Sequence, residues 1–181
     1  MLIGFVGILI FSLTLPVTKL AILSFNPYFI ALGRATLAGA VALAYLAVKH
    51  EPMLAKADIG KFVVIALGVV FGFPILTTVA MTHGSSSHGA VILGMMPLAT
   101  TVIGVLRFKE RPSLGFWLVS LLGAGLVVLY ALLKSSGSFT YIDGLLVLGG
   151  ISACIGYVEG GELSRKMNPR AVISWALVIS L

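Results

Sequence analysis

Two apolar runs separated by a short charged hinge limit what this chain can fold into more than any other feature. The runs cover residues 89–108 and 114–133, each 20 residues long, and the hinge is 109–113. In α-helical form each run is long enough to cross a hydrocarbon layer of ~30 Å at ~1.5 Å per residue. Because so short a hinge forces the chain to turn back, this stretch predicts two antiparallel membrane-spanning helices.

The composition indicates a membrane protein along the whole chain. Hydrophobic residues make up 59% and charged residues 10%, whereas an average soluble domain is roughly 25% charged. The formal net charge of +6 does not indicate a nucleic-acid partner, because the cations stand singly or in threes between apolar runs. We therefore predict an all-α membrane protein whose surroundings are the lipid bilayer. The apolar runs are 1–23, 27–48, 62–81, 89–108, 114–133, 142–163 and the shorter 171–181.

Lysine and arginine are distributed unevenly between alternate loops. Nine of the twelve lie in 49–61, 107–111 and 165–170, whereas the opposite loops contain only Lys134 and two cations lie within spans. Since cytoplasmic loops of membrane proteins are enriched in Lys and Arg, this bias predicts that these three loops and the amino terminus are cytoplasmic. The expected location is the inner, or plasma, membrane.

The chain also shows weak internal similarity. A shift of about 140 residues pairs several positions of the first apolar run with the sixth, and it aligns the Asn26-Pro27 turn with Asn168-Pro169. A repeat unit of five helices is odd in number, so its second copy must lie inverted in the membrane, as in many transporters. We predict a first five-helix repeat at 1–141 and the start of an inverted second repeat at 142–181, with about six and a half of ten helices present and the rest expected beyond residue 181.

Two segments, 14–35 and 85–129, resemble the EamA-type branch of the drug/metabolite transporter superfamily. The first carries Lys19 near the end of a helix and Arg34 early in the next, and the second carries a mid-helix Pro97 and a helix-closing Glu110. This resemblance implies a ten-helix fold of two inverted repeats that transports a small metabolite by alternating access. Amino acids or related compounds, often exported, are the implied substrates, with a proton or another ion as the coupling partner.

Charges inside predicted spans are expensive and often functional. Lys19 lies one turn after Pro16, where a kink is expected, and it could either meet an anionic substrate or reach the membrane surface. Arg34 could bind a carboxylate or tether backbone carbonyls of a neighbouring helix. Glu159 could exchange a proton or pair with basic residues of the 165–170 turn.

Uncharged polar residues complete the candidate substrate site. Ser12, Thr14, Thr77 and Tyr157 are expected to face a cavity, although hydroxyl groups can instead bond to carbonyls of their own helix. Outside the site, Glu110 is expected to pair with Arg107 or Arg111, and Glu162 with Arg165 or Lys166, because these residues are neighbours in the sequence.

Other classes of function find little support in the sequence. His83 and His88 do not have a zinc-binding spacing, and neither a metal nor a cofactor is expected. The spans contain no paired carboxylates, and the chain has no Gly-x-Ser-x-Gly motif, so no catalytic residue is assigned and an intramembrane enzyme is disfavoured. Two alternatives stay open: a truncated protein that does not transport, and a half-transporter that assembles with another chain, including as a dimer.

Overall fold

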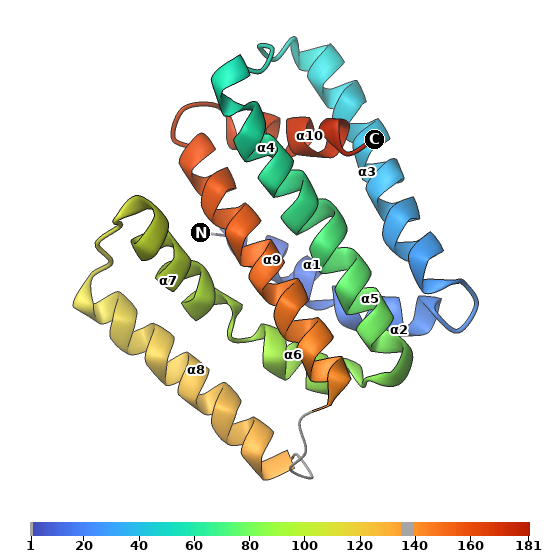
Figure 1. The fold of residues 1–181 in the computed structure, drawn as a ribbon, viewed down its shortest axis with the longest axis vertical. Helices are drawn as coiled ribbons and strands as arrows, with labels where there is room; N and C mark the ends of the chain where they lie inside the picture. Colours follow the sequence, from blue (N-terminus) through green and yellow to red (C-terminus); the bar gives the residue numbers. More distant parts are fainter. Residues whose placement is uncertain (1, 135–139) are drawn as a thin grey trace.

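The computed structural model describes residues 2–134 and 140–181, and all regular structure within these ranges is helical (Figure 1). Consecutive pieces join end to end into longer rods, so that the described chain forms a bundle of seven helical rods. The elements are α1 (Leu2–Ser12), α2 (Thr14–Ala21), α3 (Pro27–Lys49), η1 (Lys56–Asp58), α4 (Ile59–Ile65), η2 (Ala66–Gly72), α5 (Phe73–His83), α6 (Ser86–Leu93), α7 (Met96–Phe108), α8 (Leu114–Lys134), α9 (Tyr141–Leu163) and α10 (Pro169–Ile179).

Four of the rods are long and apolar enough to cross a membrane. They are Pro27–Lys49, Lys56–His83, Ser86–Phe108 and Tyr141–Leu163, and shorter apolar helices cover Phe5–Ala21, Leu114–Tyr130 and Pro169–Ile179. Many of their large apolar side chains face outward, as expected where lipid replaces water. The prediction of an all-helical, multi-pass membrane protein is confirmed.

Helix α9 is the centre of the bundle. It packs against α4, η2 and α5 on one side and against α6 and α7 on the other, whereas α8 lies at one edge and α3 at the opposite edge (Figure 1). The close contact with η2 depends on two glycines. A Cβ on Gly68 would collide with the backbone carbonyl of Ser152, and one on Gly72 would come 2.8 Å from the Ser152 hydroxyl oxygen. Small residues at this spacing allow two helices to approach this closely.

Three of the rods are interrupted immediately before a proline. The first breaks at Leu13, ahead of Pro16, and the third contains the π-helical segment η2 just ahead of Pro74. The fourth breaks between α6 and α7, ahead of Pro97. Proline lacks the N–H that would bond to the carbonyl four residues earlier and its ring clashes with that carbonyl, so the disturbance lies on the N-terminal side. The kink predicted at Pro16 is confirmed.

The three basic loops meet at one end of the bundle. There the Asn168 amide donates to the Glu51 carboxylate at 3.0 Å, and the Trp175 indole N–H donates to the Pro52 carbonyl at 3.2 Å. Which side of the membrane this end faces stays a prediction.

The two aligned Asn-Pro turns have the same local structure. Asn26 and Asn168 each cap a helix that begins with proline, and each side chain accepts a hydrogen bond from the backbone N–H two residues later, at 2.9 and 3.1 Å. This is the usual N-cap arrangement, in which the side chain satisfies an N–H that has no partner within the helix. The division of the chain into two repeats stays a prediction.

Candidate transport cavity

A cavity of about 210 Å³ lies where the three interrupted rods meet. The break between α1 and α2, the junction of η2 with α5 and the break between α6 and α7 all contribute to its wall. The lining residues are Phe11, Ser12, Thr14, Leu15, Phe73, Ala90, Leu93 and Gly94. Since a water molecule occupies ~30 Å³ in the liquid, the volume corresponds to about seven waters, or to a small solute of similar size.

The cavity lies inside the membrane-spanning part of the bundle. Gly94 follows directly on the eight-residue helix α6, so it is about 12 Å from the Ser86 end of the rod at ~1.5 Å per residue. Irregular backbone at such a depth is tolerated where it is buried in protein or lines a polar cavity. The cavity thus lies within the length of the rod, and four of its eight lining residues, Phe11, Ser12, Ala90 and Gly94, are exposed.

Two of the prolines leave backbone acceptors at this cavity. In a regular helix residue 16 would donate to the carbonyl of Ser12, and residue 97 to the carbonyl of Leu93. Pro16 and Pro97 cannot make these bonds, and both Ser12 and Leu93 line the cavity. The site therefore combines apolar walls with carbonyl oxygens that lack their usual helical partner.

The apolar wall is tightly packed. The rings of Phe11 and Phe73 stack with centroids 6.0 Å apart. Leu15, Phe73 and Leu93 belong to a buried cluster that also contains Leu146 of α9. The central helix thus supports the wall from behind, while the first, third and fourth rods supply the lining.

The predicted hydroxyl residues lie in two different settings. Ser12 and Thr14 line the cavity, and the Ser12 hydroxyl donates to the Leu9 carbonyl at 2.7 Å. Thr77 is buried in α5, where its hydroxyl donates to the Phe73 carbonyl at 2.6 Å. The Thr77 hydroxyl therefore bonds to a carbonyl of its own helix, which was the alternative to facing a cavity.

Lys19 and Arg34 lie outside the cavity lining. The Lys19 ammonium donates to the carbonyls of Met81 and Gly84, both at 2.8 Å. These carbonyls belong to the C-terminal end of α5, where the helix dipole favours a cation. Arg34 lies on α3 and is exposed, and Tyr157 lies on α9 and is 38% exposed.

Glu159 is buried and has a partner that sequence proximity did not indicate. Its carboxylate accepts a hydrogen bond from the Arg107 Nε at 2.9 Å, and the other carboxylate oxygen, Oε2, has no partner. The expected pairing of Glu159 with Arg165 or Lys166 is therefore wrong. Glu159 is only 4% exposed. Its contact with Arg107 shows that α9 directs this side chain toward α7.

The predicted partner of Glu110 at the surface is also wrong. Glu110 accepts from Arg165 at 2.6 Å and not from its sequence neighbours. Glu162 pairs with Arg165 at 3.6 Å, which confirms its expected pairing with Arg165 or Lys166, whereas Lys166 pairs with Asp58 at 3.8 Å. For Glu110, a contact between loops that meet at the same end of the bundle has replaced the local pair.

A second contact between the rods was not apparent in the sequence. The His88 ring meets the Asp143 carboxylate, and Asp143 also accepts from the backbone N–H and the hydroxyl of Thr140 at 2.7 and 2.8 Å. The Thr140-x-x-Asp143 spacing is a capping-box signal, but nothing local links it to His88. The His88–Asp143 contact and the Arg107–Glu159 pair therefore connect α9 to the α6–α7 rod near the two ends of that rod.

No cluster of three or more His, Cys, Asp or Glu residues that could hold a metal ion occurs in ranges 2–134 and 140–181.

Comparison with known proteins gives two matches. The EamA-like transporter family matches residues 1–132. A Bacillus subtilis (strain 168) protein named "Uncharacterized transporter YdeK" is 44% identical over 178 residues, which are 98% of this chain and 62% of that protein. This chain therefore spans less than two thirds of the length of that relative. No solved structure matches.

Proposed function

This chain belongs to the EamA-like transporter family, and we propose that it moves a small metabolite across the membrane by alternating access. The observation that carries the proposal is the cavity formed by three proline-linked breaks at mid-span. Broken helices at the binding site are a recurrent design in membrane transporters, since the freed backbone groups can coordinate the cargo. In this proposal the two five-helix repeats surround that site, and the basic loops face the cytoplasm.

The lining favours a particular kind of substrate. The carbonyls of Ser12 and Leu93 are acceptors, so the substrate should carry hydrogen-bond donors, as the ammonium group of an amino acid does. Phe11, Leu15 and Phe73 offer an apolar surface for a small side chain. We assign Ser12 and Thr14 to substrate binding in an exporter of amino acids or related compounds.

Proton coupling is assigned to Glu159. Its Oε2 has no partner while its Oε1 accepts from Arg107, so the residue has one oxygen free to take up a proton inside the bundle. Arg34 on α3 and Tyr157 on α9 are the groups proposed to attract a substrate carboxylate, because a guanidinium and a phenol hydroxyl can both donate hydrogen bonds to it. Lys19 and Thr77, whose polar groups bind backbone carbonyls, are assigned to holding α5.

The second candidate function is that of a half-transporter that must assemble with another chain. The aligned part covers 62% of the Bacillus subtilis relative. A pair of proteins separates the two candidates. One is the 181-residue chain, and the other is the same chain followed by the remaining segment of that relative.

The assay is efflux of preloaded radiolabelled amino acids from cells that express either protein. Efflux by the extended protein alone supports a single-chain transporter, and efflux by the 181-residue chain supports assembly of copies. Efflux by neither protein contradicts the transport proposal. Within an active protein, Thr14→Leu should reduce efflux at least about tenfold by filling the cavity. The control Thr36→Ala should have no effect, because that hydroxyl is exposed and bonds to the Leu32 carbonyl of its own helix.

A further inference from the structure

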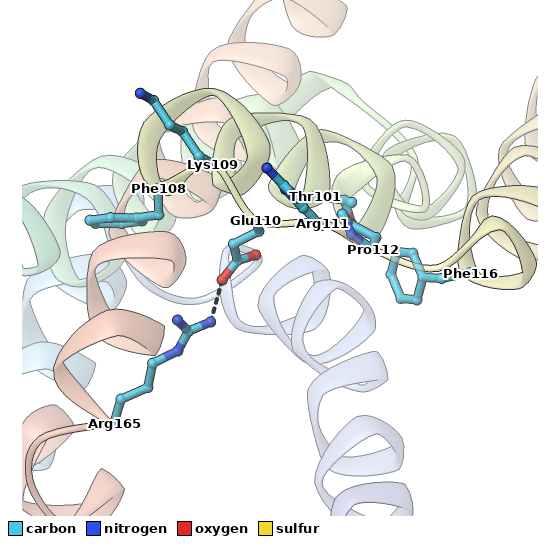
Figure 2. A pocket seen from close by; sticks show the side chains of 8 residues that line it. All are labelled: Thr101, Phe108, Lys109, Glu110, Arg111, Pro112, Phe116 and Arg165. Carbon is cyan, nitrogen blue, oxygen red and sulfur yellow. Dashed lines mark hydrogen bonds and ion pairs between the residues drawn. The ribbon is translucent and has the colours of Figure 1, made fainter.

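A second pocket lies at the basic end of the bundle, far along the rods from the transport cavity. It has a volume of about 520 Å³ and lies between the α7–α8 hinge and the end of α9. Its lining residues are Thr101, Phe108, Lys109, Glu110, Arg111, Pro112, Phe116 and Arg165. Figure 2 shows the Glu110 carboxylate and the Arg165 guanidinium pointing toward each other across it, with Phe108 on one side and Phe116 on the other.

The charges of the pocket favour an anion. Three cations and one carboxylate line it, and the carboxylate is already engaged by Arg165 at 2.6 Å. Arg111 and Lys109 are exposed. Arg165 is shared between Glu110 at 2.6 Å and Glu162 at 3.6 Å. Because an arginine fork can bind two phosphate oxygens at once, Arg111, together with the Lys109 ammonium, can hold a phosphate group.

The surroundings of the pocket identify the phosphate as that of a lipid. Leu106 and Leu114 flank the hinge and are 78% and 82% exposed, as expected for side chains that face hydrocarbon. The cations between them therefore lie at the level of lipid headgroups. From Phe116 an apolar strip continues along α8 through Val119, which is 71% exposed, to Gly123, where an added Cβ would meet nothing within 4 Å.

We propose that this pocket binds the phosphate headgroup of an anionic phospholipid, with an acyl chain along the Phe116–Gly123 strip of α8. Glu110 competes with the headgroup for Arg165, because both are anions and approach the same guanidinium. The Glu110 carboxylate lies over Gly104, where a Cβ would come within 2.8 Å of it, so the absence of a side chain at Gly104 leaves room for the carboxylate.

For the test, the purified chain is placed in phosphatidylcholine nanodiscs that either contain or lack phosphatidylglycerol. Native mass spectrometry then measures how much phosphatidylglycerol stays bound to the chain. Arg111→Gln should weaken retention about fivefold, which corresponds to ~1 kcal/mol for one cation near an anionic lipid surface. Glu110→Gln should strengthen it several-fold by releasing Arg165. The matched control is Asp58→Asn, which removes the same charge at the same end but outside the pocket, and which should change nothing.

Separate arms distinguish the sources of phosphate and detect misfolding. Inorganic phosphate and glycerol phosphate should not displace the lipid, since they lack the acyl chain. Displacement by either at concentrations equal to those of the lipid overturns the assignment to a lipid. Equal retention by Arg111→Gln and the original chain, or equal strengthening by Glu110→Gln and Asp58→Asn, overturns the pocket. Unchanged gel-filtration profiles are expected for all three variants, because none of the changed residues is buried.

Discussion

The ion pair between Arg107 and Glu159 gives a sharp prediction because its two partners differ so much in burial. The Arg107 side chain is 62% exposed and that of Glu159 is 5% exposed, with Nε and Oε1 2.9 Å apart. Removing the arginine leaves an uncompensated carboxylate inside the bundle, whereas removing the carboxylate leaves a cation that can be solvated. The two single substitutions should therefore have unequal effects on stability.

The magnitudes follow from this asymmetry. Breaking a buried pair by removing one partner costs about 3–5 kcal/mol. We expect Arg107→Gln to cost about 3 kcal/mol, near the lower end, because Arg107 is largely exposed and its attraction is screened. Glu159→Gln should cost less than ~1 kcal/mol, and the double variant should regain most of the loss. For a chain of this size ~3 kcal/mol corresponds to a decrease in Tm of roughly 6–12 °C.

The assay is thermal unfolding in detergent of the original chain, the two single variants and the double variant. Arg165→Gln serves as the control, since its contact with Glu110 is shorter, at 2.6 Å, but lies between side chains 63% and 39% exposed. That control should cost less than ~1 kcal/mol. A loss in the double variant as large as in Arg107→Gln, or a loss in Glu159→Gln of equal size, would refute the reasoning from burial.

Three further substitutions test the packing and the caps by the same thermal measurement. Gly68→Ala should lower stability by about 3 kcal/mol or prevent folding, because its Cβ would collide with the Ser152 carbonyl. The control Gly123→Ala should be neutral, because an added Cβ there meets open space. Equal effects of the two substitutions would contradict the close approach of η2 and α9. Asp143→Ala should cost about 2 kcal/mol, since it removes the cap of α9 and the contact with His88, and a neutral result would exclude that role. Asn168→Ala should cost about 1 kcal/mol, because it removes the N-cap of α10. An unchanged stability would show that the Asn168 side chain does not cap this helix.

The features that could be predicted from the sequence are those determined by nearby residues. Apolar length predicts the rods, and the hinge at 109–113 predicts the return of α8. Pro16 and Pro74 predict helix breaks because proline removes a hydrogen bond within four residues of itself. Asn26 and Asn168 predict helix starts for the same local reason.

The contacts between rods could not be predicted, because they depend on how each helix is rotated about its axis. Helix α9 is apolar on all sides, so its sequence has no polar face that would show the direction of Glu159. Arg107 is 52 residues away in the chain and His88 is 55 residues from Asp143. The same limit applies to the cavity: each proline break is visible separately, but their meeting at one place follows only from the packing around α9.

The two charged contacts of α9 also suggest how access to the cavity would alternate in the proposed transport cycle. His88 lies on α6 and Arg107 lies on α7, so each contact holds a different half of the same broken rod. The break at Gly94 lies between these halves and lines the cavity. Because a helix break absorbs changes of backbone angle at few residues, α6 would in this proposal tilt away from α9 while α7 stays bound through Glu159. The reverse movement would follow when Glu159 takes up a proton and releases Arg107. The substrate site, the hinge and the proposed proton site would then be coupled through one rod.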